Sequence, residues 1–120
     1  MFEGNKKDFN IFKDQINPNE DTIYKLQKFV RMLGDYQKTM NLIGKSTMSS
    51  IWTRHILDSA QIEKILPKEN NKYITIDVGT GAGFPGLVLA AMGRADLLLC
   101  EKSKKKYILK CSSQRVQLKC

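Results

Sequence analysis

The sequence predicts an α/β fold. A helical N-terminal extension, residues 1–70, precedes the first β-α-β-α part of a parallel sheet, residues 71–120. In the first part, apolar residues recur at helical spacing. A β-branched run then leads into a glycine-rich turn and an apolar helix, residues 73–92, and a second apolar run follows at residues 95–100. This order of strand, helix and strand is that of a βαβ unit.

Three helices are expected before the first strand. The first is short and has its apolar face at Phe9, Phe12 and Ile16. The Asn-Pro-Asn run at residues 17–19 ends it. A longer second helix begins with Asp21 or Thr22 as its cap and ends before Gly44. Its apolar positions recur at helical spacing: Ile23, Leu26, Val30, Leu33, Tyr36 and Met40.

The third helix, which opens at residue 46 or 47 and stops at Pro67, carries a polar cluster. Arg54 and Asp58 are four residues apart and can form a surface ion pair, and His55 precedes Asp58 by three residues. Read structurally, the cluster is a surface pair beside a packed histidine. Read functionally, it is a polar patch facing the glycine-rich turn, able to hold a substrate phosphate or base.

The glycine-rich turn is the most informative stretch. Ile74, Ile76 and Val78 give the run before it the composition of a buried parallel strand. Asp77 stands at the end of that strand, and four glycines follow, at positions 79, 81, 83 and 86. Pro85 fits the first turn of the next helix. Such a corner lets a ligand approach the backbone closely and meet unpaired N–H groups and the positive end of a helix dipole.

Two classes of ligand compete for this corner. The dinucleotide pattern G-x-G-x-x-G fits Gly81, Gly83 and Gly86. In that pattern, however, the first glycine comes directly after the strand. A reading that starts at Gly79 puts Phe84 where the third glycine belongs. The dinucleotide interpretation is therefore the weaker one.

The second pattern, D-x-G-x-G-x-G, matches residues 77–83 without a gap. It is the nucleoside-binding motif of enzymes that use S-adenosylmethionine. The second apolar run places Glu101 at the end of the next strand, 22 residues after Gly79. That spacing suits a carboxylate that binds both hydroxyls of a ribose. We therefore favour S-adenosylmethionine over a dinucleotide.

A basic run, residues 102–106, follows Glu101. It is either a solvated helix start, with Ser103 as the cap, or an electrostatic funnel for a phosphate backbone beside the turn. The apolar residues beyond it suggest a helix that covers the second strand: Tyr107, Ile108, Cys111, Val116 and Leu118.

Composition narrows the class of protein. The net charge of +8, from 20 basic and 12 acidic residues, favours polyanionic partners, nucleic acid first. Three cysteines and one histidine in 120 residues argue against a structural zinc site or a disulfide framework, so a reducing cytoplasm is expected. The sequence contains neither a membrane-spanning run nor the apolar core of a secretory signal.

Four separate motifs, in order, resemble the small-subunit ribosomal RNA (guanine-N7) methyltransferase family, also called glucose-inhibited division protein B. They are Asn-Leu-Ile-Gly at 41–44, Arg-His-Ile-Leu-Asp-Ser at 54–59, the turn extended by Phe-Pro-Gly at 76–86, and Glu-Lys-Ser-Lys-Lys-Lys at 101–106. The extended turn is far more specific than its glycines alone. The matched segments run from about residue 20 to 110.

The resemblance implies a class I (Rossmann-like) methyltransferase fold behind a helical extension, with S-adenosylmethionine as the methyl donor and N7 of a guanine in 16S rRNA as the acceptor. Asp77 would lie at the amino-acid end of the cofactor and Glu101 at its ribose. The residues assigned to the cofactor are Asp77, Gly79, Thr80, Gly81, Ala82, Gly83, Phe84 and Glu101. Arg54, His55 and Asp58 fall on a family motif, as candidates for site architecture or RNA contact.

The sequence departs from the family by its length. Family members continue through several more strands, one of which pairs with the free side of the first strand. Without that partner, residues 73–78 would form an exposed apolar edge. We therefore expect the 120-residue chain alone to be poorly soluble or oligomeric and to transfer no methyl group. Two further interpretations stay open: a non-catalytic basic RNA-binding or ribosome-assembly module, and a fragment of an NAD(P)-dependent oxidoreductase.

Overall fold

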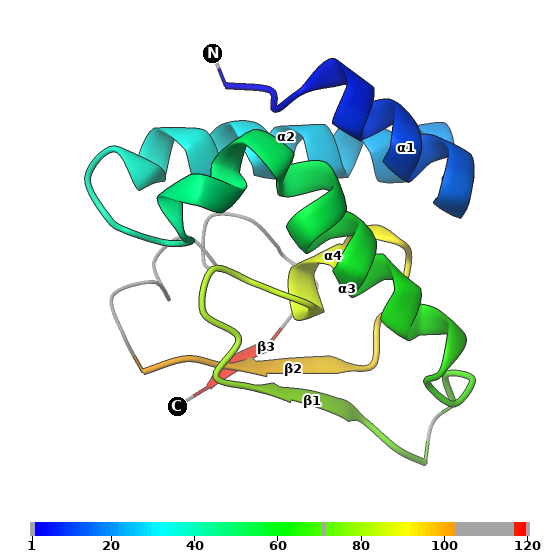
Figure 1. Ribbon diagram of the computed structural model, residues 1–120. Helices are drawn as coiled ribbons and strands as arrows, with labels where there is room; N and C mark the ends of the chain where they lie inside the picture. Colours follow the sequence, from blue (N-terminus) through cyan, green and yellow to red (C-terminus); the bar gives the residue numbers. More distant parts are fainter. Residues whose placement is uncertain (1, 71, 103–116, 120) are drawn as a thin grey trace.

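The computed structural model describes residues 2–70, 72–102 and 117–119 (Figure 1). Helices lie over one face of a small parallel sheet. The elements are α1 (Lys6–Ile16), α2 (Glu20–Gln37), η1 (Lys45–Ser50), η2 (Trp52–Leu57), α3 (Asp58–Ala60), η3 (Gln61–Lys64), β1 (Thr75–Val78), α4 (Gly86–Ala91), β2 (Leu97–Cys100) and β3 (Gln117–Lys119).

Helix α1 packs on η2 through its aromatic residues and one carboxylate. Phe12 is fully buried, and the rings of Phe9 and Phe12 lie 4.6 and 5.4 Å from the ring of Trp52. Asp8 accepts hydrogen bonds from the backbone N–H groups of Trp52 and Thr53, at 2.9 and 3.2 Å. Because helix-terminal N–H groups lack partners within their own helix, the Asp8 carboxylate joins α1 to the start of η2.

Helix α2 is confirmed, but its predicted cap is wrong. Asn19, with extended backbone, is the N-cap, and its side chain accepts from the Thr22 N–H at 2.8 Å. The carboxamide oxygen lies three residues before the N–H it satisfies, which is the usual capping geometry. Thr22 points inward instead, and its hydroxyl donates to the carbonyl of Ala91 at 3.0 Å. That bond connects α2 to the end of α4.

The segment after α2 is held by one side chain. Gln37 accepts from the N–H groups of Leu42 and Ile43 and donates to Asn41 Oδ1 and to the Ile43 carbonyl. The helix therefore ends earlier than the sequence predicts. Gly44 belongs to the next element, as the N-cap of η1.

The third predicted helix is a chain of short helical turns. A 3₁₀ turn (η1) leads into a π-helical stretch (η2), one α-helical turn (α3) and a second 3₁₀ turn (η3). Trp52 and Ile56 face the core and are buried. The π-helical turn changes which residues share a face, because its hydrogen bonds run from i to i+5.

The sheet has the order β1-β2-β3, all parallel, with Ile76 opposite Leu98 and Leu98 opposite Gln117. The strand-helix-strand prediction is confirmed by β1, α4 and β2. The prediction of a helix that extends to residue 118 is wrong, because Gln117–Lys119 form β3, which pairs with β2. Residues 103–116, which include most of that helix and of the basic run, lie outside the described residues.

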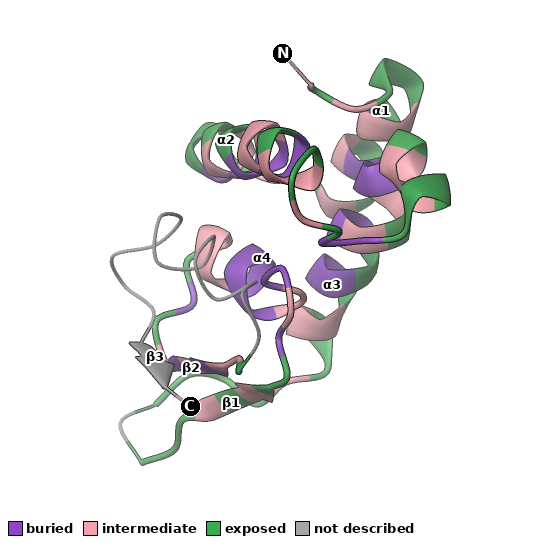
Figure 2. Cartoon of the chain, turned by 90° about the vertical axis from the view of Figure 1, so that its left-hand side faces the viewer, coloured by how far each residue is buried: buried purple, intermediate pink, exposed green. Residues whose placement is uncertain are grey.

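Burial on β1 is the reverse of what its composition predicts. Ile74, Ile76 and Val78 are 63, 52 and 80% exposed. The prediction of a buried strand is wrong, because α4 covers the other face of the sheet, where Leu97 and Leu99 are buried (Figure 2). Within the described sheet β1 is an edge strand, so the expected exposed apolar edge is confirmed.

A buried ion cluster closes the end of the sheet where the strands begin. Arg94 donates through Nε and Nη2 to Asp96, at 2.6 and 3.0 Å, and through Nη1 to Glu63, at 3.1 Å. The side chains of Arg94 and Asp96 are 3 and 8% exposed. Burial alone would raise the pKa of Asp96, but hydrogen bonds from Arg94 and Thr75 and the Arg94 charge hold it below the usual value.

Candidate functional site

The glycine-rich turn joins the end of β1 to the start of α4. Gly79, Gly81 and Gly83 have φ angles of 69°, 62° and 116°. Residues with a Cβ rarely adopt such angles, so this path of the chain requires glycine. The glycines of the sequence pattern therefore mark the positions where the backbone of the turn has a positive φ.

The space beside the turn is open where a ligand would need it. A Cβ added at Gly79 or Gly81 would meet no atom within 4 Å. A Cβ at Gly86 would lie 2.7 Å from Leu99 and 2.9 Å from the Asp77 carboxylate. The first two glycines therefore leave room at the surface of the turn, whereas Gly86 is needed for packing of α4 on β2.

Two carboxylates hold the turn. Asp77 accepts from the hydroxyl of Thr80 at 2.5 Å and from the N–H of Gly86 at 2.9 Å. Glu101, at the end of β2, accepts from the N–H of Gly81 at 2.7 Å. Both carboxylates predicted from the sequence therefore lie at the turn, and Glu101 is directed toward the open glycines.

The backbone N–H groups of the turn are not the free donors that the sequence suggested. Gly79 and Thr80 donate to the carbonyl of Cys100, and Gly83 and Phe84 donate to the carbonyl of Thr80. With Gly81 bound to Glu101, that expectation is wrong for these residues. Helix α4 has only six residues, so its dipole adds little. The turn offers a ligand open backbone surface and two carboxylates.

Phe84 connects the turn to the helical extension. Its ring stacks on His55, with centroids 5.0 Å apart, and contacts Phe29 of α2 at 5.5 Å. His55 Nε2 lies 2.9 Å from the Thr47 hydroxyl, which fixes the ring. Burial, then the charge of Arg54, lower the pKa of His55, against the opposing charge of Asp58. The neutral imidazole is therefore favoured in the stack.

Of the polar cluster on the third helix, the structure brings only His55 to the turn. Arg54 and Asp58 are exposed, and no ion pair joins them among the described residues. Their predicted i,i+4 pairing assumes an α-helix, whereas η2 is π-helical across residue 54.

The contacts of two residues in this region, Thr47 and Phe29, were not predicted from the sequence. Thr47 lies eight positions before His55, a separation that carries no signal of contact. Phe29 fits the helical spacing of Leu26 and Leu33 and could have been found from it. Contacts between separate helices, by contrast, cannot be read from spacing within one helix.

The described residues hold no group of three or more His, Cys, Asp or Glu side chains that could bind a metal ion. In the same part of the chain, each helix is too short or too polar to cross a membrane.

Known proteins are similar in sequence to most of this chain. The model of the family described as rRNA small subunit methyltransferase G matches residues 22–119. A protein named ribosomal RNA small subunit methyltransferase G from Rhodospirillum rubrum is 35% identical over 105 residues, covering 88% of this chain and 51% of the relative. One of the same name from Cereibacter sphaeroides is 42% identical over 101 residues, covering 84% of this chain and 46% of the relative.

A third relative of that name, from Jannaschia sp., is 43% identical over 76 residues, covering 63% of this chain and 35% of its own length. The chain thus spans about half the length of the first two relatives. The glycine-rich turn, Glu101, His55 and Phe29 all lie within the family match. The chain belongs to the rRNA small subunit methyltransferase G family.

Proposed function

We propose that this chain supplies the cofactor-binding part of an S-adenosylmethionine-dependent methyltransferase that methylates N7 of a guanine in 16S rRNA. The observation that carries the proposal is the open turn at Gly79 and Gly81, with the Glu101 carboxylate held against it. The relatives' name, ribosomal RNA small subunit methyltransferase G, supports the class of substrate.

The residues at the turn fit an adenosine ligand. Gly79 and Gly81 leave space for close approach to the backbone. Glu101, a hydrogen-bond acceptor at the end of β2, suits the two donor hydroxyls of a ribose. Asp77 holds Thr80 and the start of α4 in place, so part of its role is to maintain the turn that the cofactor would meet.

The proposed reaction needs few catalytic groups. S-adenosylmethionine supplies a methyl group that is already activated by its positive sulfonium. Guanine N7 carries a lone pair and no proton, so no general base is required. The task of the chain is then to hold the reacting atoms in line and to exclude competing geometries.

We assign His55 a positioning role within this function. It touches Phe84 of the turn and is fixed by Thr47. Arg54 and Asp58 lie on the surface beside it, where they are available to RNA. Residues 1–70 would form the helical extension, and residues 71–120 the start of a class I methyltransferase domain.

The test is calorimetry with S-adenosylmethionine on the wild type and on Gly81→Val. We expect the variant to lose cofactor binding, because the valine side chain fills the open space and disfavours the φ of 62°. Gly44→Ala is the control, since Gly44 has an ordinary φ of −61° and is the N-cap of η1, not a residue of the turn. NAD serves as the competing ligand. Equal binding by Gly81→Val and Gly44→Ala, or preference for NAD, would overturn the proposal.

A further inference from the structure

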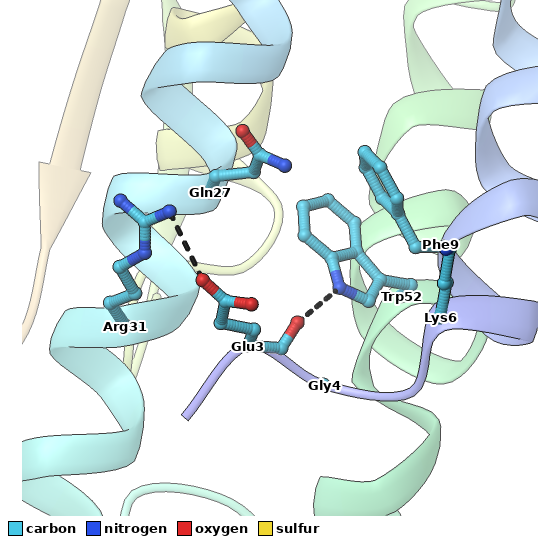
Figure 3. A pocket seen from close by; sticks show the side chains of 7 residues that line it. All are labelled: Glu3, Gly4, Lys6, Phe9, Gln27, Arg31 and Trp52. Atoms are coloured by element: carbon cyan, nitrogen blue, oxygen red, sulfur yellow. Dashed lines mark hydrogen bonds and ion pairs between the residues drawn. The ribbon is translucent and has the colours of Figure 1, made fainter. Parts of the chain in front are cut away.

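A pocket of about 330 Å³ lies at the opposite end of the helical layer from the sheet, between the N-terminal segment, α1, α2 and η2 (Figure 3). Gly4 lies on its floor, and its side-chain walls are Glu3, Lys6, Phe9, Gln27, Arg31 and Trp52. The glycine-rich turn contributes no residue to it. Its volume is at the small end of the range of ligand-binding pockets.

Hydrogen-bond donors outnumber acceptors in this pocket. Arg31 Nε is buried and has no partner among the described residues. Gln27, one turn earlier on α2, projects its amide from the same wall, as Figure 3 shows. Lys6 adds a second cation at the rim, against the single carboxylate of Glu3. The pocket therefore has a net positive charge and unused donors.

The carboxylate already present is weakly held. Arg31 Nη2 lies 3.3 Å from Glu3 Oε1, and the two side chains are 39 and 67% exposed. An ion pair this long and this exposed contributes little to stability. Glu3 thus occupies the anion position without being locked into it, and an incoming oxyanion can displace it.

The aromatic wall is rigid, so the pocket is formed in advance. The indole N–H of Trp52 donates to the carbonyl of Glu3 at 3.0 Å, and its ring packs on Phe9. Gly4 has a φ of 78°, and a Cβ there would lie 2.8 Å from the indole ring. The path of the N-terminal segment past Trp52 therefore requires glycine.

We propose that this pocket binds a phosphate group, with Arg31 as its main ligand, Gln27 as a neutral donor and Glu3 as the internal competitor. Arg31 and Gln27 on α2, together with Lys6 on α1, place several donors around the pocket, which suits a tetrahedral phosphate with several accessible oxygens. An RNA backbone is the source that the proposed function would supply, and in that respect the inference rests on it. Free inorganic phosphate is the other source.

The experiment uses Trp52, the single tryptophan of the chain, as a fluorescent reporter. Inorganic phosphate is titrated into the full chain at ionic strength held constant with chloride. We expect a saturable change in the wild type and a Kd raised at least about tenfold in Arg31→Gln. Glu3→Gln should lower the Kd about threefold or more, because the competing charge is gone. A merely structural Glu3 would not have this effect.

The matched control is Lys28→Gln, the same loss of charge at an exposed position of α2 that does not line the pocket. Circular dichroism verifies that each variant is folded. No saturable change in either the wild type or Glu3→Gln, or equal losses in Arg31→Gln and Lys28→Gln, would refute the proposal.

A short single-stranded RNA, titrated in the same way, identifies the source. An Arg31-dependent change with RNA assigns the pocket to the RNA backbone, and a change with inorganic phosphate alone assigns it to the free ion. Neither titration contains S-adenosylmethionine, so failure of the proposed methyltransferase function would leave this result unaffected.

Discussion

The two ends of the parallel sheet use the same residue types in opposite ways. Where the strands begin, Asp96 and Glu63 surround the buried guanidinium of Arg94, and the cluster is closed to solvent on most sides. Where the strands end, Asp77 and Glu101 accept from backbone N–H groups and leave the turn beside them open.

The difference lies in what each carboxylate holds. The buried Arg94 cation joins η3 and the Pro67 carbonyl to Asp96 just before β2, whereas backbone N–H groups fix a loop whose outer surface stays accessible. Ligands of open α/β sheets bind at the ends where the strands finish. We therefore infer that one end of this sheet serves stability and propose that the other binds the cofactor, and the predictions below test that division.

The largest effect is expected from Arg94→Leu, which should lower the free energy of unfolding by about 3–5 kcal/mol. Removing one partner leaves Asp96 buried and uncompensated. Urea denaturation followed by circular dichroism measures the loss. Arg54→Leu, which removes an exposed arginine, is the control and should change stability by less than about 0.5 kcal/mol. Similar losses in both variants would contradict the assigned role.

Gly86→Ala should destabilise the chain by about 1–3 kcal/mol, because the new methyl group would lie 2.7 Å from Leu99 and force α4 away from β2. The same denaturation experiment applies. Gly44→Ala again provides the comparison, since its Cβ would make only ordinary contact with Thr47. If the two alanine variants were equally stable, α4 would not be packed against β2 in solution as described.

Much of the turn could be predicted from the sequence because its requirements are local. Positive φ at Gly79 and Gly81 depends on the absence of a Cβ, which the letters state directly. The exposure of Ile76 could not be predicted, because it depends on which face α4 covers. The stack of His55 on Phe84 likewise depends on how the helical layer meets the sheet. Composition therefore predicted that β1 is a strand, but not which of its faces is covered.

A smaller effect is expected from Glu101→Gln, about 0.5–1.5 kcal/mol of stability. The amide still accepts from the Gly81 N–H, but the bond is no longer charge-assisted. Calorimetry should also show weaker binding of S-adenosylmethionine, since the turn loses its charged acceptor. Asp58→Asn, an exposed carboxylate away from the turn, controls for the change in net charge. A cofactor affinity unchanged in Glu101→Gln would remove Glu101 from the site.

The last and smallest predicted effect is the loss of stability that follows protonation of Asp96 at acid pH. Its pKa in the folded chain lies below the ordinary value of 3.8, so its contribution to stability is complete above that pH. As the pH falls through 3.8 toward the lower folded value, the contribution is lost. Between pH 5 and pH 3, the Tm should therefore fall less steeply with falling pH in Asp96→Asn than in the wild type. Parallel declines would show that Asp96 does not titrate as a bound carboxylate.

The outward side chains of β1 also determine how the chain behaves in different buffers. Contact between two such apolar surfaces needs no charge, whereas the net charge of +8 makes whole molecules repel one another. Salt at about 0.15 M shortens the range of that repulsion to about 8 Å and leaves the apolar attraction intact. We therefore expect self-association of the chain to be weakest in dilute buffer and to increase toward precipitation as ionic strength rises.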